Sequence, residues 1–264
     1  MLDILQPYFR GEWTRYGESL RLCDPAATPP SVAEWLSHST ALERVLARHE
    51  RALNGARVRK AVASDWLLRY FTALLPPLVV LSSFMKYSVP AGLEEISLTL
   101  DEQGAPLGFA VPHIGSRSAA SDTAARYDAL LWRHIHPLII QFAARTGVPP
   151  DILWGNARRT LLTVFERALP LAGNSTALSA ALAQDRQVLL DSPSWTNERP
   201  NPLFLRHRQV LPGSGDRAAT HALTLHASCC LAYQLPHSSH CGACPLSARH
   251  RKAGEAREER EFFT

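Results

Sequence analysis

Several features that define other protein classes are missing from this chain. Its first residues, 1–7, have neither a basic stretch nor an apolar one, so we expect no signal peptide. No basic stripe is interleaved with aromatic residues, which argues against nucleic-acid binding. We also find no nucleophile triad, phosphate-binding loop or dinucleotide fingerprint. Any catalytic activity must therefore depend on a chemical group other than these.

A long uninterrupted apolar run is also missing. The longest apolar region, residues 66–86, contains Arg69 and the pair Pro76–Pro77. The apolar pieces between them are shorter than the roughly 20 residues that a membrane-spanning helix needs. We expect two buried helical pieces with a break at the prolines, and at most a peripheral association with a membrane.

Cysteine is scarce and unevenly placed. The chain has 264 residues, of which 46% are hydrophobic and 20% charged, with a formal net charge of +4. This is an ordinary composition for a soluble globular protein with a sizeable core. Of the five cysteines, only Cys23 lies outside residues 229–244, and we expect it to be a buried or partly buried thiol. Clustered cysteines without a secretion signal indicate a metal site in a reducing, cytoplasmic compartment.

The remaining four cysteines have an unusual spacing. Cys229 and Cys230 are adjacent, and Cys241 and Cys244 form a Cys-x-x-Cys turn after ten intervening residues. Four soft thiolates suit zinc or an iron–sulfur cluster. Adjacent side chains diverge in a strand or a helix, so the pair can share a site only if the backbone bends or the site is larger than one atom. A 2Fe–2S cluster is such a site, whereas structural zinc more often uses two Cys-x-x-Cys turns, or one turn and two histidines. A disulfide or simple buried thiols are the remaining alternatives.

The pattern from Cys229 to Cys244 resembles the C-terminal signature of the FhuF-like ferric siderophore reductases. The resemblance implies a 2Fe–2S cluster bound by all four cysteines. It also implies one-electron reduction of a ferric siderophore, of the hydroxamate type, with release of Fe(II). A weaker similarity to this family lies in Asp151–Asn156. The family often has basic residues before the cysteine pair, whereas this chain has Ala227 and Ser228 there. This departure bears on the tuning of the cluster and leaves its ligation intact.

Other side chains are candidates for roles around the cluster. His226, His240 and Tyr233 could contact or tune it, and His221 and His237 lie in the same stretch. Ligation by a histidine would require one cysteine to drop out. Trp154 and Asn156 could pack the cysteine stretch or line a substrate cleft, although a core tryptophan and a buried, hydrogen-bonded amide are the commoner explanation. Trp195 is a third candidate for the cleft.

The hydrophobic patterning predicts an α+β fold with a mostly helical body, a small antiparallel hairpin sheet and a C-terminal cysteine-rich segment. Strands alternate at 96–100 and 107–111 around a turn at 102–104, and 79–81 could supply another strand. Ser31 with Glu34 fits a capping box, and Ser64 or Asp65 can cap a later helix. Further helices are expected at 41–53, 124–146, 150–169 and 175–191. Residues 1–30 should be irregular, and residues 192–220 should form a long packed loop. The charged tail 249–261 should be an exposed helix end. We divide the chain into an α+β region (1–115), a helical region with the long loop (116–220) and the cluster-binding segment (221–264).

Two rival functions remain at this stage. One is a zinc-stabilised binding protein whose C-terminal segment is a structural clip. The other is an iron–sulfur electron-transfer or sensor protein. For a reductase, the partners would be a ferric siderophore and an electron donor, which is either another protein or a small reductant, because the chain carries no cofactor-binding fingerprint of its own.

Overall fold

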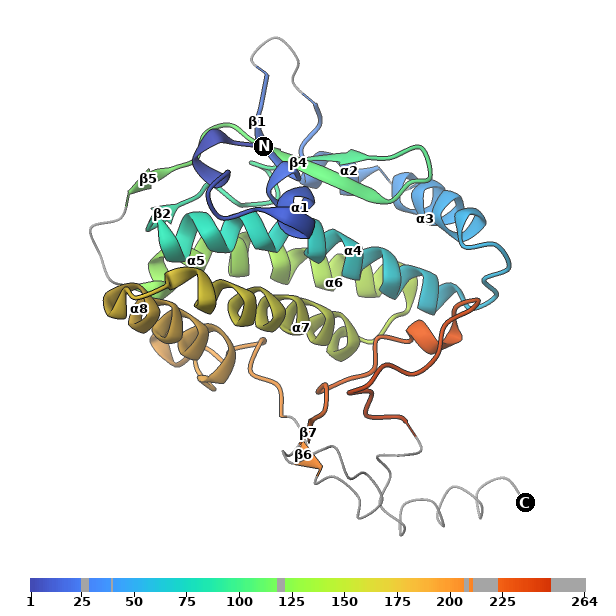
Figure 1. Cartoon of the computed structure of the whole chain (residues 1–264). Helices are drawn as coiled ribbons and strands as arrows, with labels where there is room; N and C mark the ends of the chain where they lie inside the picture. Colours follow the sequence, from blue (N-terminus) through green and yellow to red (C-terminus); the bar gives the residue numbers. More distant parts are fainter. Residues whose placement is uncertain (25–28, 39, 118–121, 207–208, 211–222, 248–264) are drawn as a thin grey trace.

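The computed structural model describes residues 1–24, 29–38, 40–117, 122–206, 209–210 and 223–247. It confirms the α+β class, with a helical body and small sheets (Figure 1). The α-helices are α1 (Thr14–Glu18), α2 (Val32–Ser37), α3 (Ala41–Ala52), α4 (Arg59–Val79), α5 (Thr123–Leu130), α6 (His136–Thr146), α7 (Pro150–Ala168) and α8 (Thr176–Arg186). The strands are β1 (Leu20–Leu22), β2 (Tyr87–Ser88), β3 (Ser97–Leu100), β4 (Pro106–Val111), β5 (Ser116–Arg117), β6 (Gln209–Val210) and β7 (Leu223–Thr224).

Helix α4 lies at the centre of the molecule. The three-stranded sheet covers one side of it, and α6 and α7 lie along the other (Figure 1). Trp66 of α4 shows how these layers meet. Its ring stacks on Trp35 of α2 and on Phe142 of α6, with 5.8 Å between ring centroids in each pair. Its indole N–H donates to the Gly104 carbonyl in the hairpin turn, at 2.7 Å. One buried aromatic residue therefore joins both layers to the central helix.

The central sheet contains the predicted hairpin. Strands β3 and β4 pair antiparallel, and the Asp101 carboxylate accepts the Ala105 N–H across the turn. The third strand is β1, which runs parallel to β4 with Leu20 opposite Phe109. The suggestion that residues 79–81 supply a strand is wrong, because they are helical. The first thirty residues are also more regular than predicted, since they contain β1, α1 and short 3₁₀ turns.

The predicted break at Pro76–Pro77 is wrong, because α4 continues through both prolines to Val79. Pro77 cannot donate the backbone hydrogen bond that would reach the Ala73 carbonyl. The Ser19 hydroxyl lies 2.7 Å from that oxygen and 2.6 Å from the Tyr16 carbonyl, so its one proton is shared between two acceptors. A polar group from a distant part of the chain thus meets the carbonyl that the proline leaves without its helical donor. A π-helical turn, Val80–Phe84, follows directly.

Most other helix predictions are confirmed. The Ser31–Glu34 capping box is present, and α7 begins at Pro150 as expected. The 124–146 helix is α5 and α6 joined by a π-helical turn (Leu131–Ile135), and the 175–191 helix is α8 with another such turn (Gln187–Asp191). The capping prediction for Ser64 or Asp65 is wrong. Helix α4 begins at Arg59, and Ser64 lies buried inside it.

The buried hydrophobic residues form one connected core, whose members extend in the sequence from Leu5 to Leu203. It buries Trp195 of the predicted packed loop, whereas Phe204 of the same loop is exposed. The Asn201 amide donates to the Leu189 and Ser192 carbonyls and holds the first part of the loop. Residues 207–208 and 211–220 of the loop lie outside the described residues. The division of the chain at residues 115 and 220 stays a prediction, and the predicted tail helix at 249–261 lies outside the described residues.

Among the described helices, the Arg59–Phe84 segment alone is long and apolar enough to cross a membrane. Its most apolar window is 78% buried inside the molecule. The central position of α4, surrounded by sheet and helices, accounts for this composition as that of a core helix.

Candidate metal centre

Residues 223–247, which we call the cysteine segment, lie beside the N-terminal ends of α4 and α7 (Figure 1). The segment contains little regular structure, only β7 and a 3₁₀ turn at Ala232–Gln234. Leu231 and Leu235 provide its apolar contact with the body, against Ala61 and Val62 of α4. Its shape therefore depends mainly on turns and hydrogen bonds.

The backbone bends directly after the cysteine pair. Leu231 has φ of 64°, the left-handed conformation, which is uncommon for a residue with a β-carbon. Its N–H points back at the Cys229 sulfur, 3.4 Å away. The bend required for adjacent cysteines to share a site is thus present in the structure. It also supplies an N–H donor to a sulfur, an interaction that stabilises a thiolate.

The Cys241–Cys244 turn forms a hydrogen bond within itself and another with the residues that precede the Cys229–Cys230 pair. The Cys244 N–H donates to the Cys241 carbonyl at 3.1 Å, and the His226 N–H donates to the Ala243 carbonyl at 2.9 Å. The Ala243 N–H also interacts with the Cys241 thiol and favours its ionised form. The two halves of the motif, ten residues apart in sequence, therefore lie side by side.

The sulfurs of Cys229 and Cys244 lie 3.6 Å apart, and both residues are buried. Two thiolates about 2.3 Å from one tetrahedral metal lie about 3.8 Å apart, so this pair has the spacing of ligands to a single metal atom. Cys230 and Cys241 are close enough for their charges to interact. No three His, Cys, Asp or Glu side chains of the described residues form a site for a single ion.

Burial opposes ionisation of these thiols. It raises the pKa of Cys229 to about 12, an effect to which the neighbouring Cys244 and Cys230 contribute, while the Leu231 N–H acts in the other direction. Burial also raises the pKa of Cys241. Metal coordination deprotonates thiols outright, so cluster binding replaces these protons with iron.

Three residues of the body hold the backbone of the cysteine pair. The Ser64 hydroxyl of α4 donates to the Cys230 carbonyl at 2.8 Å, and the Asn156 amide of α7 donates to the Ser64 hydroxyl oxygen at 3.0 Å. The Arg159 guanidinium donates to the Ser228 carbonyl at 2.7 Å. This network fixes Ser228 and Cys230 on either side of Cys229.

Gly155 allows the cysteine segment to approach α7 closely. A β-carbon at this position would lie 1.9 Å from the Ser228 hydroxyl oxygen and 3.3 Å from its β-carbon. The same hydroxyl donates to the Asp151 carbonyl at 3.0 Å. A glycine is therefore needed at the contact between the helix and the segment.

Comparison with protein-family models supplies the assignment. Residues 64–217 match the family described as "Ferric iron reductase FhuF-like transporter", and residues 227–246 match "FhuF 2Fe-2S C-terminal domain". The chain belongs to the FhuF-like ferric iron reductase family. A comparison with curated proteins gave no match.

Membership of this family settles the kind of cofactor and confirms the resemblance drawn from the cysteine pattern. The domain that carries the four cysteines is a 2Fe–2S domain, which favours the cluster over the zinc alternative. The match to the larger family model begins at Ser64, whose hydroxyl contacts the Cys230 carbonyl. That each of the four cysteines is a ligand stays a prediction, and the 3.6 Å approach of the Cys229 and Cys244 sulfurs supports it.

The residues predicted to tune the cluster lie in different settings. Tyr233 and His240 stack on each other, with 4.3 Å between ring centroids and 14° between planes, next to Cys241 in sequence. His226 is half-buried, and burial together with the Arg159 charge lowers its pKa to about 4. Their effect on the cluster stays a prediction. His221 lies outside the described residues.

The structure buries the three residues predicted for a substrate cleft. Trp154 packs near His136, with 6.2 Å between ring centroids, and Trp195 packs near Trp132, at 6.4 Å. Asn156 has no exposed surface and contributes through Ser64 to the holding of the cysteine pair. A cleft role for these residues stays a prediction that their burial does not favour.

Sequence reasoning missed Ser64, Gly155 and Arg159. A glycine inside a helix that is otherwise well patterned is a signal of close packing. It could have identified Gly155 as a contact point, although not its partner.

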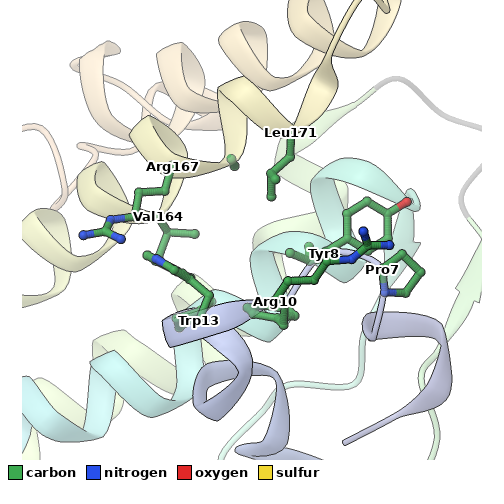
Figure 2. A pocket seen from close by; sticks show the side chains of 11 residues that line it. Pro7, Tyr8, Arg10, Trp13, Val164, Arg167 and Leu171 are labelled. Atoms are coloured by element: carbon green, nitrogen blue, oxygen red, sulfur yellow. The ribbon is translucent and has the colours of Figure 1, made fainter.

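Several cavities border α7, and two of them differ in their relation to the cysteine segment. One, of about 140 Å³, lies between residues 7–13 and the C-terminal half of α7 (Figure 2). There the Arg167 guanidinium lies over the Trp13 ring, 4.8 Å from its centroid, and no residue of the cysteine segment takes part. The other, of about 390 Å³, is bordered by α7 and by residues 224–227 of the cysteine segment. Of these two cavities, the second adjoins the metal centre.

Proposed function

We propose that this protein is a reductase of ferric siderophores of the hydroxamate type, which delivers one electron through a cluster held by Cys229, Cys230, Cys241 and Cys244. The observation that carries the proposal is the convergence of the two cysteine pairs in a 2Fe–2S domain of a ferric iron reductase family. The cluster supplies one electron to the bound ferric ion, which becomes Fe(II). Hydroxamate oxygens are hard ligands that prefer Fe(III), so reduction weakens the chelate and the metal leaves.

The protein's own residues have positioning roles in this proposal. Ser64, Asn156 and Arg159 hold the backbone of the cysteine pair, and the Leu231 and Ala243 amides donate toward sulfur. Such donors and the degree of burial determine the potential of an iron–sulfur centre. No acid–base group is needed, because the reaction is the transfer of a single electron.

We place the reaction in the cytoplasm, with electrons from a donor protein or a small reductant. The central helix is mostly buried, so we propose at most a peripheral contact with a membrane. Clustered thiols that bind a metal suit a reducing compartment.

The first test is spectroscopic. The protein, purified without oxygen, should be red-brown, contain iron and sulfide in equal amounts, and give a rhombic EPR signal after reduction with dithionite. Cys229→Ser and Cys244→Ser should each abolish the spectrum, and Cys23→Ser, the remaining cysteine, should leave it unchanged. Retention of the full spectrum and iron content by either of the first two variants would show that the ligand set is wrong.

The second test is turnover. Protein reduced by dithionite and then freed of it should convert a ferric trihydroxamate to Fe(II), detected by a chromogenic ferrous chelator, with one Fe(II) formed for each reduced cluster. A colourless protein containing zinc would support the structural-clip alternative. A cluster that reduces cleanly and passes no electron to any ferric chelate would support the electron-transfer or sensor alternative.

A further inference from the structure

The cavity of about 390 Å³ beside the cysteine segment has the size of a ligand site, which usually measures about 300–1,000 Å³. One wall is α7, with Arg159 and Thr163, and another is residues 224–227. Leu162 and Leu225 add apolar surface. The cavity is therefore partly apolar and partly charged, as sites for bulky amphipathic ligands are.

Counted over the protein side chains alone, without the metal centre, the charged groups around the cavity leave a positive surplus. Arg158, Arg159 and Arg186 line it together with one carboxylate, Glu166. Asp191 forms ion pairs with Arg158 at 3.4 Å and with Arg186 at 2.9 Å, so three cations face two carboxylates. The Arg159 guanidinium donates to the backbone carbonyls of Ser228 and Gly155, and its charge also favours the ionised form of the Cys241 thiol. His226 adds no charge at neutral pH, because burial and Arg159 lower its pKa to about 4.

The cavity also lies close to the metal centre. Ala227 borders it, and Cys229 is two residues further along the chain, a span of at most roughly 7 Å. Arg159 touches both features, since it lines the cavity and donates to the Ser228 carbonyl. A ligand in the cavity would therefore be held near the cluster with little intervening protein.

We infer that this cavity is the binding site for the ferric chelate, and that it favours chelates with net negative charge. The inference rests on the proposed function and specifies its substrate. Three singly charged hydroxamates balance Fe(III) and leave a neutral complex. A chelate in which an α-hydroxycarboxylate replaces one hydroxamate carries a negative charge, which suits the arginine surplus. The organic periphery would lie against Leu162 and Leu225.

Gallium(III) chelates test the site without electron transfer, because gallium(III) is not reduced under these conditions. We would titrate the cluster-loaded protein with a gallium dihydroxamate–hydroxycarboxylate and with a gallium trihydroxamate by calorimetry. The anionic chelate should bind more tightly, and added salt should weaken its binding more. Arg186→Gln should weaken binding of the anionic chelate by about two- to fivefold, and Glu166→Gln should strengthen it by a similar factor.

Arg145→Gln is the matched control. Arg145 is exposed on α6 outside the cavity lining, and its replacement makes the same charge change as Arg186→Gln. It should leave both affinities unchanged. Equal binding of the two chelates, with Arg186→Gln and Glu166→Gln both matching the wild type, would overturn the inference.

The site and the proposed function can fail separately. Charge-dependent gallium binding without any reduction of the corresponding ferric chelate would leave the site standing and remove the reductase proposal. Reduction of ferric chelates, combined with gallium binding that ignores Arg186 and Glu166, would remove the site and leave the reductase proposal standing.

Discussion

At the scale of single residues, Gly155 controls how closely the cysteine segment approaches α7. In Gly155→Ala the new β-carbon would meet the Ser228 hydroxyl, which must turn away and give up its hydrogen bond to the Asp151 carbonyl. Losing that bond costs about 1 kcal/mol. Alanine also favours the helix by about 1 kcal/mol over glycine, so global stability should change little. The expected result is local: faster hydrogen exchange in residues 223–247 and faster loss of iron to a chelator.

A second substitution separates this contact from other effects of the alanine. Ser228→Ala removes the hydroxyl that lies 1.9 Å from the added β-carbon. Adding Gly155→Ala to Ser228→Ala should therefore cause little further loss of exchange protection, because the hydroxyl and its bond to the Asp151 carbonyl are already gone. If Gly155→Ala alone exchanged like the wild type, the contact would not position the segment.

His134 provides a pH-dependent contribution to the stability of the body. It is fully buried, its Nδ1–H donates to the Ala91 carbonyl at 2.8 Å, and its Nε2 accepts from the Tyr70 hydroxyl at 2.6 Å. Burial lowers its pKa to about 4, against 6.5 for the unfolded chain. Between these values the unfolded state binds more protons, so stability falls as the pH drops from 6.5 towards 4. From pH 7 to pH 5 this should cost roughly 2 kcal/mol.

The contribution of His134 can be isolated by urea unfolding of wild type and His134→Gln at both pH values. The variant should be less stable at pH 7, because it loses the packing and hydrogen bonds of the ring. It should also lose less stability on acidification than the wild type. The pKa of His226 is lowered as well, but this histidine is present in both proteins and its effect cancels in the comparison. Parallel pH dependence in the two proteins would contradict the assignment.

At the scale of elements, α4 shows where local sequence stops being sufficient. Pro76–Pro77 predicts a helix end, but the helix continues, and the hydroxyl of Ser19, more than fifty residues earlier, meets the Ala73 carbonyl. Strand β1 is a similar case, since its three residues pair parallel with β4 far along the chain. The hairpin β3–β4 and the Ser31 cap were predictable because their partners lie within a few residues.

The residues of the metal centre likewise fall into those that the sequence could predict and those that it could not. The cysteines could be identified because four soft ligands lie within one short stretch, and the pattern from Cys229 to Cys244 carries most of the resemblance to the family. The residues that hold the stretch could not be identified, because the Ser64–Cys230 and Arg159–Ser228 contacts join positions far apart in sequence. Periodicity places Arg159 on a helix and suggests Ser64 only as a helix cap, and it does not indicate which distant segment either residue faces.

At the scale of the whole molecule, the body and the cysteine segment differ in what stabilises them. The body has a continuous apolar core from Leu5 to Leu203, centred on α4. The cysteine segment contacts it through Leu231 and Leu235 and a few hydrogen bonds. Metal binding stabilises small cysteine-rich units that lack a core of their own. The cluster should therefore be required for the segment and dispensable for the body.

Removal of iron by a strong chelator in the absence of oxygen tests this division. Far-UV circular dichroism should change little, because the segment holds only β7 and one 3₁₀ turn, and the thermal transition of the body should persist. Hydrogen exchange should accelerate in residues 223–247 and remain slow in α4 and α7. Apart from Ser64, which would lose its contact with the Cys230 carbonyl, the helices should keep their protection. Loss of the thermal transition on iron removal would show instead that the cluster stabilises the entire fold, and the 223–247 boundary would then have no energetic meaning.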